Sequence, residues 1–186
     1  MQSSPELIAI VFAALALVWF IAAFNGLIAL RNRVRNAWAE IDVQLKRRHE
    51  LIPNLVESVR AYMQHERSVL EAVTQARAQA MAVGANIQER SAAESTLTAA
   101  LAKLFALVEN YPQLRAVESV QLLQEQLTST ENRIAFARQF YNDEVMKYNT
   151  MQATFPRNLF AGLLGFSPAA MFTAEDVDRQ NVQVKI

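Results

Sequence analysis

The sequence predicts an all-α protein in which an N-terminal transmembrane helix continues into an antiparallel, four-helix-type bundle. Three observations lead to this prediction. A charge-free apolar stretch lies near the N-terminus, long amphipathic patterns follow it, and the 186 residues contain only four Gly and five Pro. No strand-like alternation of useful length accompanies them. Because amphipathic helices joined by short connections pack antiparallel, a bundle is the default architecture.

The apolar stretch, Leu7 to Leu30, has the length of a membrane span. Its 24 residues would cover about 36 Å as a helix. A bilayer hydrocarbon core is about 30 Å thick, and a single segment can cross it only as a helix. A cleaved signal peptide would have a basic N-terminal region and a shorter apolar run, and a buried core helix would also be shorter. The pattern therefore favours a transmembrane helix.

Basic residues lie on one flank of this span. Glu6 precedes it and no basic residue does. Six basic residues follow it within the window that sets membrane topology: Arg31, Arg33, Arg35, Lys46, Arg47 and Arg48. The sequence therefore predicts a single-pass protein with its N-terminus outside and its body in the cytoplasm. The first three arginines are close enough to the span to contact anionic headgroups.

Helical patterns account for most of the remaining chain. The span continues without a stop signal to about residue 51, and further helices are predicted over 54–82, 87–111 and 119–154. The helix predicted over 87–111 has apolar residues at heptad spacing, as in coiled coils. Pro53 leaves two possibilities open, a kink in one continuing helix or a turn into a new one. The apolar stripe passes through Pro53 in phase, which favours the kink.

Three segments follow from these patterns. They are residues 1–30 as a short N-terminus and transmembrane helix, 31–156 as the helical bundle, and 157–186 as an apolar segment and tail. The apolar part, residues 158–166, is too short to span a membrane. It could cap the open end of the bundle, lie on the membrane or contact a neighbouring subunit.

Composition and motifs argue against most catalytic chemistry. The chain has no Cys, and its 18 basic residues balance 18 acidic ones, so we expect no thiolate site and no nucleic-acid partner. The two histidines, His49 and His65, lack the spacing of di-iron or zinc motifs. Acidic pairs such as Asp143 and Glu144 are expected on solvated faces. We predict no catalytic residue, no metal site and no cofactor.

One stretch is unusually mixed in character. Residues 36–55 combine Trp, acids, bases, His and Pro more closely than any other part of the chain. A pure core helix does not need that mixture, so we predict an interaction surface here. Its candidate residues are Trp38, Asp42, Lys46, Arg47, Arg48, His49 and Glu50. The simpler interpretation of the basic cluster is a solvated face that pairs with the neighbouring acids.

The same stretch resembles the signature of the LemA family. The resemblance begins at Arg31 and includes NAWAEIDVQLKRRHELIPNLVE at residues 36–57. It continues in His65-Glu66, Ala76-Arg77, LFALVENYP at 104–112, TENRIA at 130–135, RQFYN at 138–142, YNT at 148–150, FPRNL at 155–159 and Gly165-Phe166. It covers the chain from the span to about Phe172 and leaves residues 173–186 outside the shared pattern.

This resemblance implies a protein of the bacterial cytoplasmic (inner) membrane with one N-terminal span. It implies a soluble part of four helices, which favours a turn at Pro53. The family has no established enzymatic activity and supplies no catalytic residues. A magnetosome member suggests roles in membrane organisation. Neighbouring genes for membrane metallopeptidases or other envelope proteins suggest a membrane metallopeptidase or similar protein as a partner.

Together these observations predict a membrane-anchored scaffold or interaction protein without catalytic activity of its own. Its expected partners are the lipid bilayer and further copies of itself, as a homo-oligomer. Two alternatives come from other function classes. One is a metal-dependent or other hydrolase that uses His49 and His65. The other is an oligomeric pore or transport subunit, although the span has no charged residue to face water.

Overall fold

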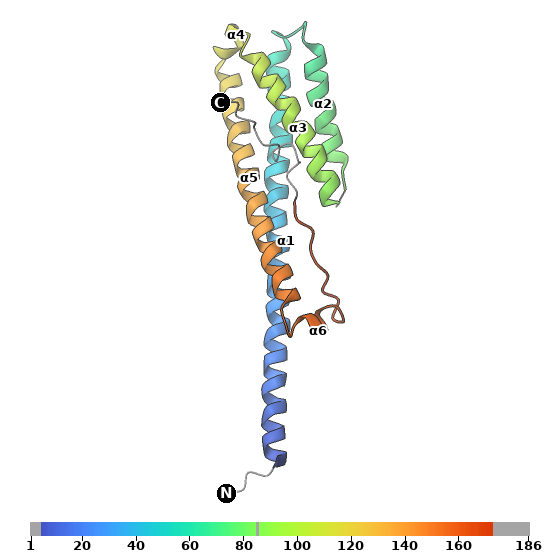
Figure 1. Cartoon of the computed structure of the whole chain (residues 1–186). Helices are drawn as coiled ribbons and strands as arrows, with labels where there is room; N and C mark the ends of the chain where they lie inside the picture. The colour runs from blue at the N-terminus through green and yellow to red at the C-terminus, as the bar shows by residue number, and fades with distance from the viewer. Residues whose placement is uncertain (1–4, 85, 173–186) are drawn as a thin grey trace, which may run out of the picture. The chain divides into compact units, whose positions relative to one another are not determined.

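The computed structural model describes residues 5–84 and 86–172 of the chain. Its regular elements there are all helices: α1 (Pro5–Arg60), α2 (Arg67–Ala82), α3 (Ile87–Val108), α4 (Pro112–Arg115), α5 (Glu118–Ala153) and α6 (Asn158–Ala161). The predicted all-α fold is therefore confirmed (Figure 1). The predicted tail, residues 173–186, lies outside the described residues.

The chain divides into two compact units, and both α1 and α5 contribute to each. Among the described residues, the first unit consists of residues 5–38 and 140–170. The second consists of residues 39–84, 86–139 and 171–172. The three segments predicted from the sequence follow hydropathy rather than compactness, and their boundaries stay a prediction.

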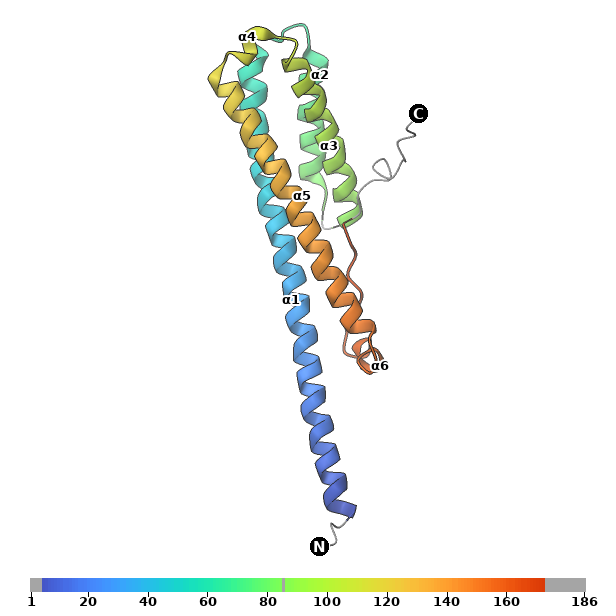
Figure 2. The ribbon, with the colours of Figure 1, turned by 60° about the vertical axis from the view of Figure 1, so that its left-hand side comes forward.

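The second unit is a helical bundle. Residues 39–60 of α1, the helices α2 and α3, and residues 118–139 of α5 lie side by side (Figure 1, Figure 2). Their apolar stripes meet in one core, whose fully buried members include Ile52, Leu55, Val59, Met63, Val73, Leu97, Leu104, Leu114 and Val120. Burial of such side chains contributes most of the stability of a bundle, at about 25 cal/mol per Å² of apolar surface.

Helix α1 continues through Pro53 and ends at Arg60. The continuing helix that the apolar stripe favoured is therefore correct, and the turn at Pro53 implied by the family resemblance is wrong. The predicted start of the next helix at residue 54 is also wrong, because α2 begins at Arg67. The apolar side chains around Pro53 explain the continuation. Ile52 and Leu55 on its two sides are both buried in the core.

The chain reverses at residues 61–66 instead. Met63 is fully buried there, and its backbone N–H donates to the carbonyl of Val59 at 3.1 Å. The Glu66 N–H donates in turn to the carbonyl of Met63 at 3.0 Å. The turn is thus fixed by one apolar side chain in the core and by local backbone bonds, with no Gly or Pro in the segment.

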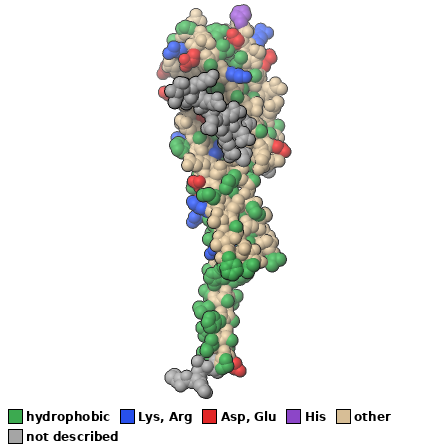
Figure 3. Space-filling view, in the orientation of Figure 1, with side chains coloured by type: hydrophobic (Ala, Val, Ile, Leu, Met, Phe, Trp, Pro, Cys, Tyr) green, Lys and Arg blue, Asp and Glu red, His purple; other side chains and the backbone are tan. Residues whose placement is uncertain are grey.

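In the first unit, the N-terminal part of α1 carries an uncovered apolar surface. Residues 5–22 are all exposed, and hydrophobic side chains cover this part of the helix (Figure 3). The helix is long and apolar enough to cross a membrane. Helix α3 passes the same test of length and composition, but it packs its apolar face into the bundle core. The predicted span is therefore helical, with the length and composition expected in a membrane protein.

The first unit also contains residues 140–153 of α5, helix α6 and the segment that follows it. Helix α5 approaches α1 at Gly26, where an added Cβ would lie 3.7 Å from the sulfur of Met151. Ala23, one turn before Gly26, and Leu27, directly after it, are buried. Small residues at this contact let two helices approach closely.

The segment after α6 is held to α5 through its backbone. The carbonyl of Phe166 accepts from Gln152 Nε2 at 2.5 Å, and that of Ser167 accepts from the Tyr148 hydroxyl at 3.1 Å. Asn149 exchanges two bonds of 2.9 Å with the N–H and carbonyl of Ala169. The Tyr141 hydroxyl donates to the carbonyl of Ala170 at 2.9 Å. Side chains from four positions of α5 therefore bind four carbonyls and one N–H of residues 166–170.

Candidate functional site

A buried cluster of charged side chains lies in the second unit, around Arg48 of α1. The side chain of Arg48 is fully buried. Its Nη2 contacts the carboxylate of Glu94 on α3, which is also fully buried. Its Nη1 lies 2.5 Å from Glu131 Oε2 on α5 and donates to Thr98 Oγ1 at 2.9 Å. One guanidinium thus connects three helices of the bundle.

The second oxygen of Glu94 faces His49. His49 Nε2 lies 3.0 Å from Glu94 Oε1, at ion-pair distance but without hydrogen-bond alignment. Burial acts to raise the pKa of Glu94, but the contact with His49 and the charge of Arg48 outweigh it, so the pKa is lowered. Glu94 is therefore held as a carboxylate inside the bundle.

Arg138 of α5 adds a second cation to this buried region. Its guanidinium carbon lies 4.6 Å from the centre of the Phe172 ring, at a distance typical of a cation–π contact. Burial first, and then the charge of Arg48, lower the pKa of Arg138, while Glu131 and Glu94 act to raise it. The positive charges of the two arginines in this cluster are balanced by the negative charges of Glu94 and Glu131. Such a cluster is weak evidence for catalysis, because structural ion-pair networks also perturb pKa values.

The candidate interaction residues do not lie on one surface. Arg48 is interior, and the side chain of His49 is only 12% exposed. Asp42 Oδ1 lies 2.5 Å from Arg90 Nη1 on α3. Trp38, in the first unit, packs against Tyr141 with ring centres 5.3 Å apart. These four residues have partners within the chain.

The remaining three candidates, Lys46, Arg47 and Glu50, are exposed on α1. Lys46 Nζ and Glu50 Oε1 are 4.0 Å apart, which is a weak surface pair. Val43 lies on the same side of the helix by its spacing and is 59% exposed. Val43, Lys46, Arg47 and Glu50 together form what we call the outer α1 face.

The headgroup-proximal arginines differ in their surroundings. Arg33 and Arg35 are exposed. Arg31 is partly covered, and its guanidinium carbon lies 5.2 Å from the centre of the Phe166 ring. Whether the three contact lipid headgroups stays a prediction.

The two histidines do not form a metal site with the acids around them. His65 is exposed in the turn after α1, whereas His49 faces Glu94. Among the described residues no group of three or more His, Cys, Asp or Glu is placed to hold a metal ion. The expectation of a solvated face is wrong for Glu144, which is buried. Lys147 Nζ donates to its Oε1 at 2.7 Å.

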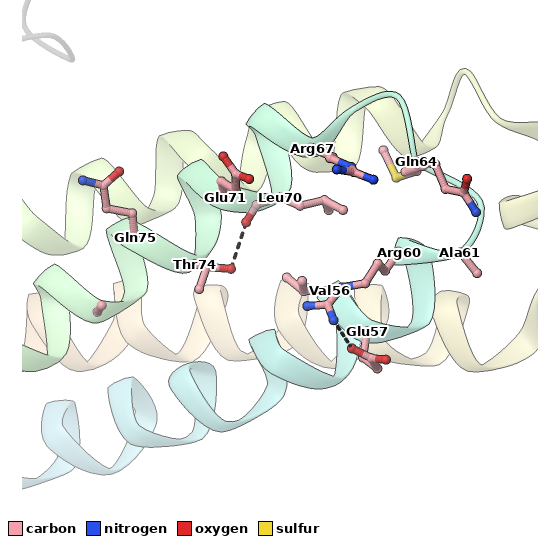
Figure 4. Close-up of a pocket in the computed structure, with 12 residues that line it drawn as sticks. Val56, Glu57, Arg60, Ala61, Gln64, Arg67, Leu70, Glu71, Thr74 and Gln75 are labelled. Atoms are coloured by element: carbon pink, nitrogen blue, oxygen red, sulfur yellow. Dashed lines mark hydrogen bonds and ion pairs between the residues drawn. The ribbon is translucent and has the colours of Figure 1, made fainter.

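An open groove of about 970 Å³ lies where the end of α1, the turn and α2 meet (Figure 4). Buried Val56, Met63 and Leu70 contribute apolar lining. Arg60 and Arg67 contribute charge, and Arg60 is paired with Glu57 at 3.1 Å. The groove therefore offers a mixed lining without a convergent set of catalytic groups.

Sequence reasoning missed Glu94, Thr98, Glu131 and Arg138. A signal for the cluster was present in the heptad pattern. Glu94 precedes Leu97 and Leu101 with the three- and four-residue steps of the core stripe, and Arg48 lies between Leu45 and Ile52 in the same way. A charged residue at a core position indicates a buried partner of opposite charge.

Comparisons with known proteins identify similar sequences. The sequence pattern of the LemA family matches residues 37–186. The match extends over residues 173–186, so the expectation that these residues lie outside the shared pattern is wrong.

Individual relatives are similar over most of the chain. Magnetosome protein MamQ 2 of Paramagnetospirillum magneticum is 25% identical, over 87% of this chain and 70% of its own length. Protein LemA of Metamycoplasma hominis is 23% identical, over 88% of this chain and 74% of its own length. Magnetosome protein MamQ of Magnetospirillum gryphiswaldense is 22% identical, over 92% of this chain and 74% of its own length. With a family match that covers most of its bundle and C-terminal segment, the chain belongs to the LemA family.

Proposed function

We propose that this chain is a membrane-anchored scaffold that self-associates through the outer α1 face and acts by binding rather than by catalysis. The observation that carries the proposal is the composition of that face. It presents Val43 beside two basic residues and one acidic residue, with no partner element covering it within the second unit. An apolar side chain with a polar rim fits the anatomy of a protein–protein interface, where arginine is enriched.

A second exposed apolar side chain of the same unit supports this proposal. Phe136 on α5 is 74% exposed. Aromatic side chains contribute more than most to the binding energy of interfaces. The names of the matched relatives add support of another kind, because two of the three named above are called magnetosome proteins. A scaffold at a membrane fits both observations.

The mass of the full-length particle tests self-association. We expect the protein part of the particle in mild detergent, after the mass of bound detergent is subtracted, to have a mass above that of one 20.9 kDa chain by light scattering. Val43→Asp places a charge in the interface and is expected to lower that mass. Met81→Asp is the matched control, because Met81 on α2 is exposed to a similar degree (55%) and is expected to leave the mass unchanged. A monomer at every concentration would overturn the proposal.

Crosslinking distinguishes a second copy from a different partner. The chain has no Cys, so Val43→Cys provides a single thiol. A bifunctional maleimide is expected to join two chains at position 43 in native membranes and not at position 81 in Met81→Cys. A crosslink only to another protein, such as a membrane metallopeptidase or other envelope protein, would contradict self-association.

We further propose that the second unit faces the cytoplasm of a bacterial inner membrane, as the basic flank of the span indicates. The same single-Cys variants test this orientation. A maleimide that cannot cross membranes is expected to label Met81→Cys only after the cells are opened. Labelling in intact cells would place the second unit on the outer side.

A further inference from the structure

The loop at the C-terminal end of α5 presents apolar side chains beside the membrane span. Residues 155–166 contain one charged residue, Arg157. The apolar side chains that remain exposed on it are Phe155, Leu159, Leu163 and Leu164. Leu163 is 88% exposed. Exposed apolar side chains that cluster in this way often mark an interaction site.

Aromatic contacts fix the level of this loop along α1. The ring of Phe160 lies 5.0 Å from that of Phe20, centre to centre, and 6.1 Å from that of Trp19. The ring of Phe166 lies 5.7 Å from that of Phe24. All three α1 residues belong to the charge-free stretch that fits a membrane crossing.

The position of the bilayer follows from Glu6, whose charge keeps the far boundary of the hydrocarbon core close to Leu7. A core about 30 Å thick is covered by about 20 helical residues, so its near boundary falls close to Gly26. Phe20 precedes Gly26 by six residues, which corresponds to about 9 Å of helix. Tilting the helix would move the near boundary towards Leu30 and bury the loop more deeply.

Part of the loop's backbone is hydrogen-bonded internally, as insertion into lipid requires. Its bonded N–H groups are those of Asn158, Leu159, Phe160, Ala161, Leu164, Gly165 and Phe166, each donating to a carbonyl within residues 154–162. The bonds of residues 166–170 to α5 hold the loop against the span. The loop therefore presents apolar side chains on a backbone whose N–H groups at 158–161 and 164–166 are paired.

We propose that residues 155–164 form a second membrane contact, which inserts Phe155, Leu159, Leu163 and Leu164 among the acyl chains of the leaflet on the basic side of the span. The occupant is lipid because the loop continues the apolar surface of the span at the depth of the leaflet. An insertion of about 5–10 Å is the range of interfacial elements that lie on a membrane without crossing it. The proposal is independent of self-association.

Lipid-quenching fluorescence on the full-length protein tests this proposal. Leu163→Cys carries an environment-sensitive fluorophore in vesicles of phosphatidylethanolamine and phosphatidylglycerol, with or without lipid that bears a nitroxide near the top of its acyl chain. We expect a blue-shifted emission and several-fold stronger quenching than for labelled Met81→Cys on α2. Leu159→Cys is the second variant, in case the label at position 163 disturbs the loop.

Two outcomes would overturn the proposal. An emission typical of water at positions 159 and 163, without quenching, would show a loop that faces solvent. A blue-shifted emission without quenching, which changes with the protein-to-lipid ratio, would show that a second copy covers the loop.

Discussion

Nε of Arg77 on α2 donates to the backbone carbonyl of His49 on α1 at 2.7 Å. Residue 53 would normally donate to this carbonyl in an α-helix, but Pro53 has no N–H. Arg77 therefore satisfies the carbonyl that the proline leaves without a helical partner. The contact also ties α2 to α1 at the point where α1 would be weakest.

Removing this donor should destabilise the bundle. We expect Arg77→Met to lower the free energy of unfolding by about 1.5–3 kcal/mol, the range for a hydrogen bond with a charged partner. Denaturant unfolding of the full-length protein in detergent measures this change. Pro53→Ala supplies the control, because alanine restores a helical donor. Arg77→Met should cost clearly less in the Pro53→Ala background, and equal costs in both would refute the coupling.

Breaking the buried charge cluster should be more costly. Arg48→Met leaves the buried carboxylate of Glu94 without its main partner, and a loss of about 3–5 kcal/mol is expected. Arg47→Met, on the exposed face one residue earlier, should change stability by about 0.5 kcal/mol or less. The double variant Arg48→Met/Glu94→Met removes both charges and should be more stable than Arg48→Met alone. If it is not, the cost comes from packing and not from charge.

The lowered pKa of Glu94 predicts an acid sensitivity. Its stabilising contribution is complete above its ordinary pKa of about 4.3 and is lost as the pH falls through the lower value in the folded state. Glu94→Gln should therefore show a smaller fall in melting temperature from pH 6 to pH 3 than the unaltered chain. Glu57→Gln is the control, because the side chain of Glu57 is 72% exposed. An identical acid dependence of all three proteins would contradict this role for Glu94.

The close approach at Gly26 predicts a size limit on α1. A Cβ there makes an ordinary contact with Met151, so Gly26→Ala should be tolerated. Gly26→Leu should force Met151 aside at a cost of about 1–3 kcal/mol. Thermal unfolding in detergent compares the two variants. A pair Gly26→Leu/Met151→Ala that recovers stability would confirm steric crowding as the cause.

The helices were predictable because their signals are local. The predicted helix 119–154 and the observed α5 (Glu118–Ala153) agree to one residue, since Phe155-Pro156 follows a long amphipathic stripe. The apolar stripe favoured the continuation of α1 through Pro53, but the end of α1 at Arg60 was not predictable, because residues 61–66 contain no Gly or Pro to mark the turn. Tertiary contacts decided the outcome there.

The candidate site was predicted less well, for a related reason. The mixed composition around Arg48 was interpreted as a surface, whereas the side chain of Arg48 is buried. Composition alone does not separate a charge that faces water from one that meets a partner in the core. The helical phase of Arg48 and Glu94 carries that information, because both charges occupy positions where leucine is expected.

The backbone attachment of residues 166–170 has a consequence for protein engineering. Because α5 holds these residues by their carbonyls and by the N–H of Ala169, the side chains at 167 and 170 can be exchanged at little cost. Pro168 has no backbone N–H, and none of these bonds uses an N–H at position 168. Its ring also favours an extended backbone. A reporter group at position 167 or 170 would thus leave the attachment intact, whereas proline at 169 would remove one of its five hydrogen bonds, the one from the Ala169 N–H to Asn149 Oδ1.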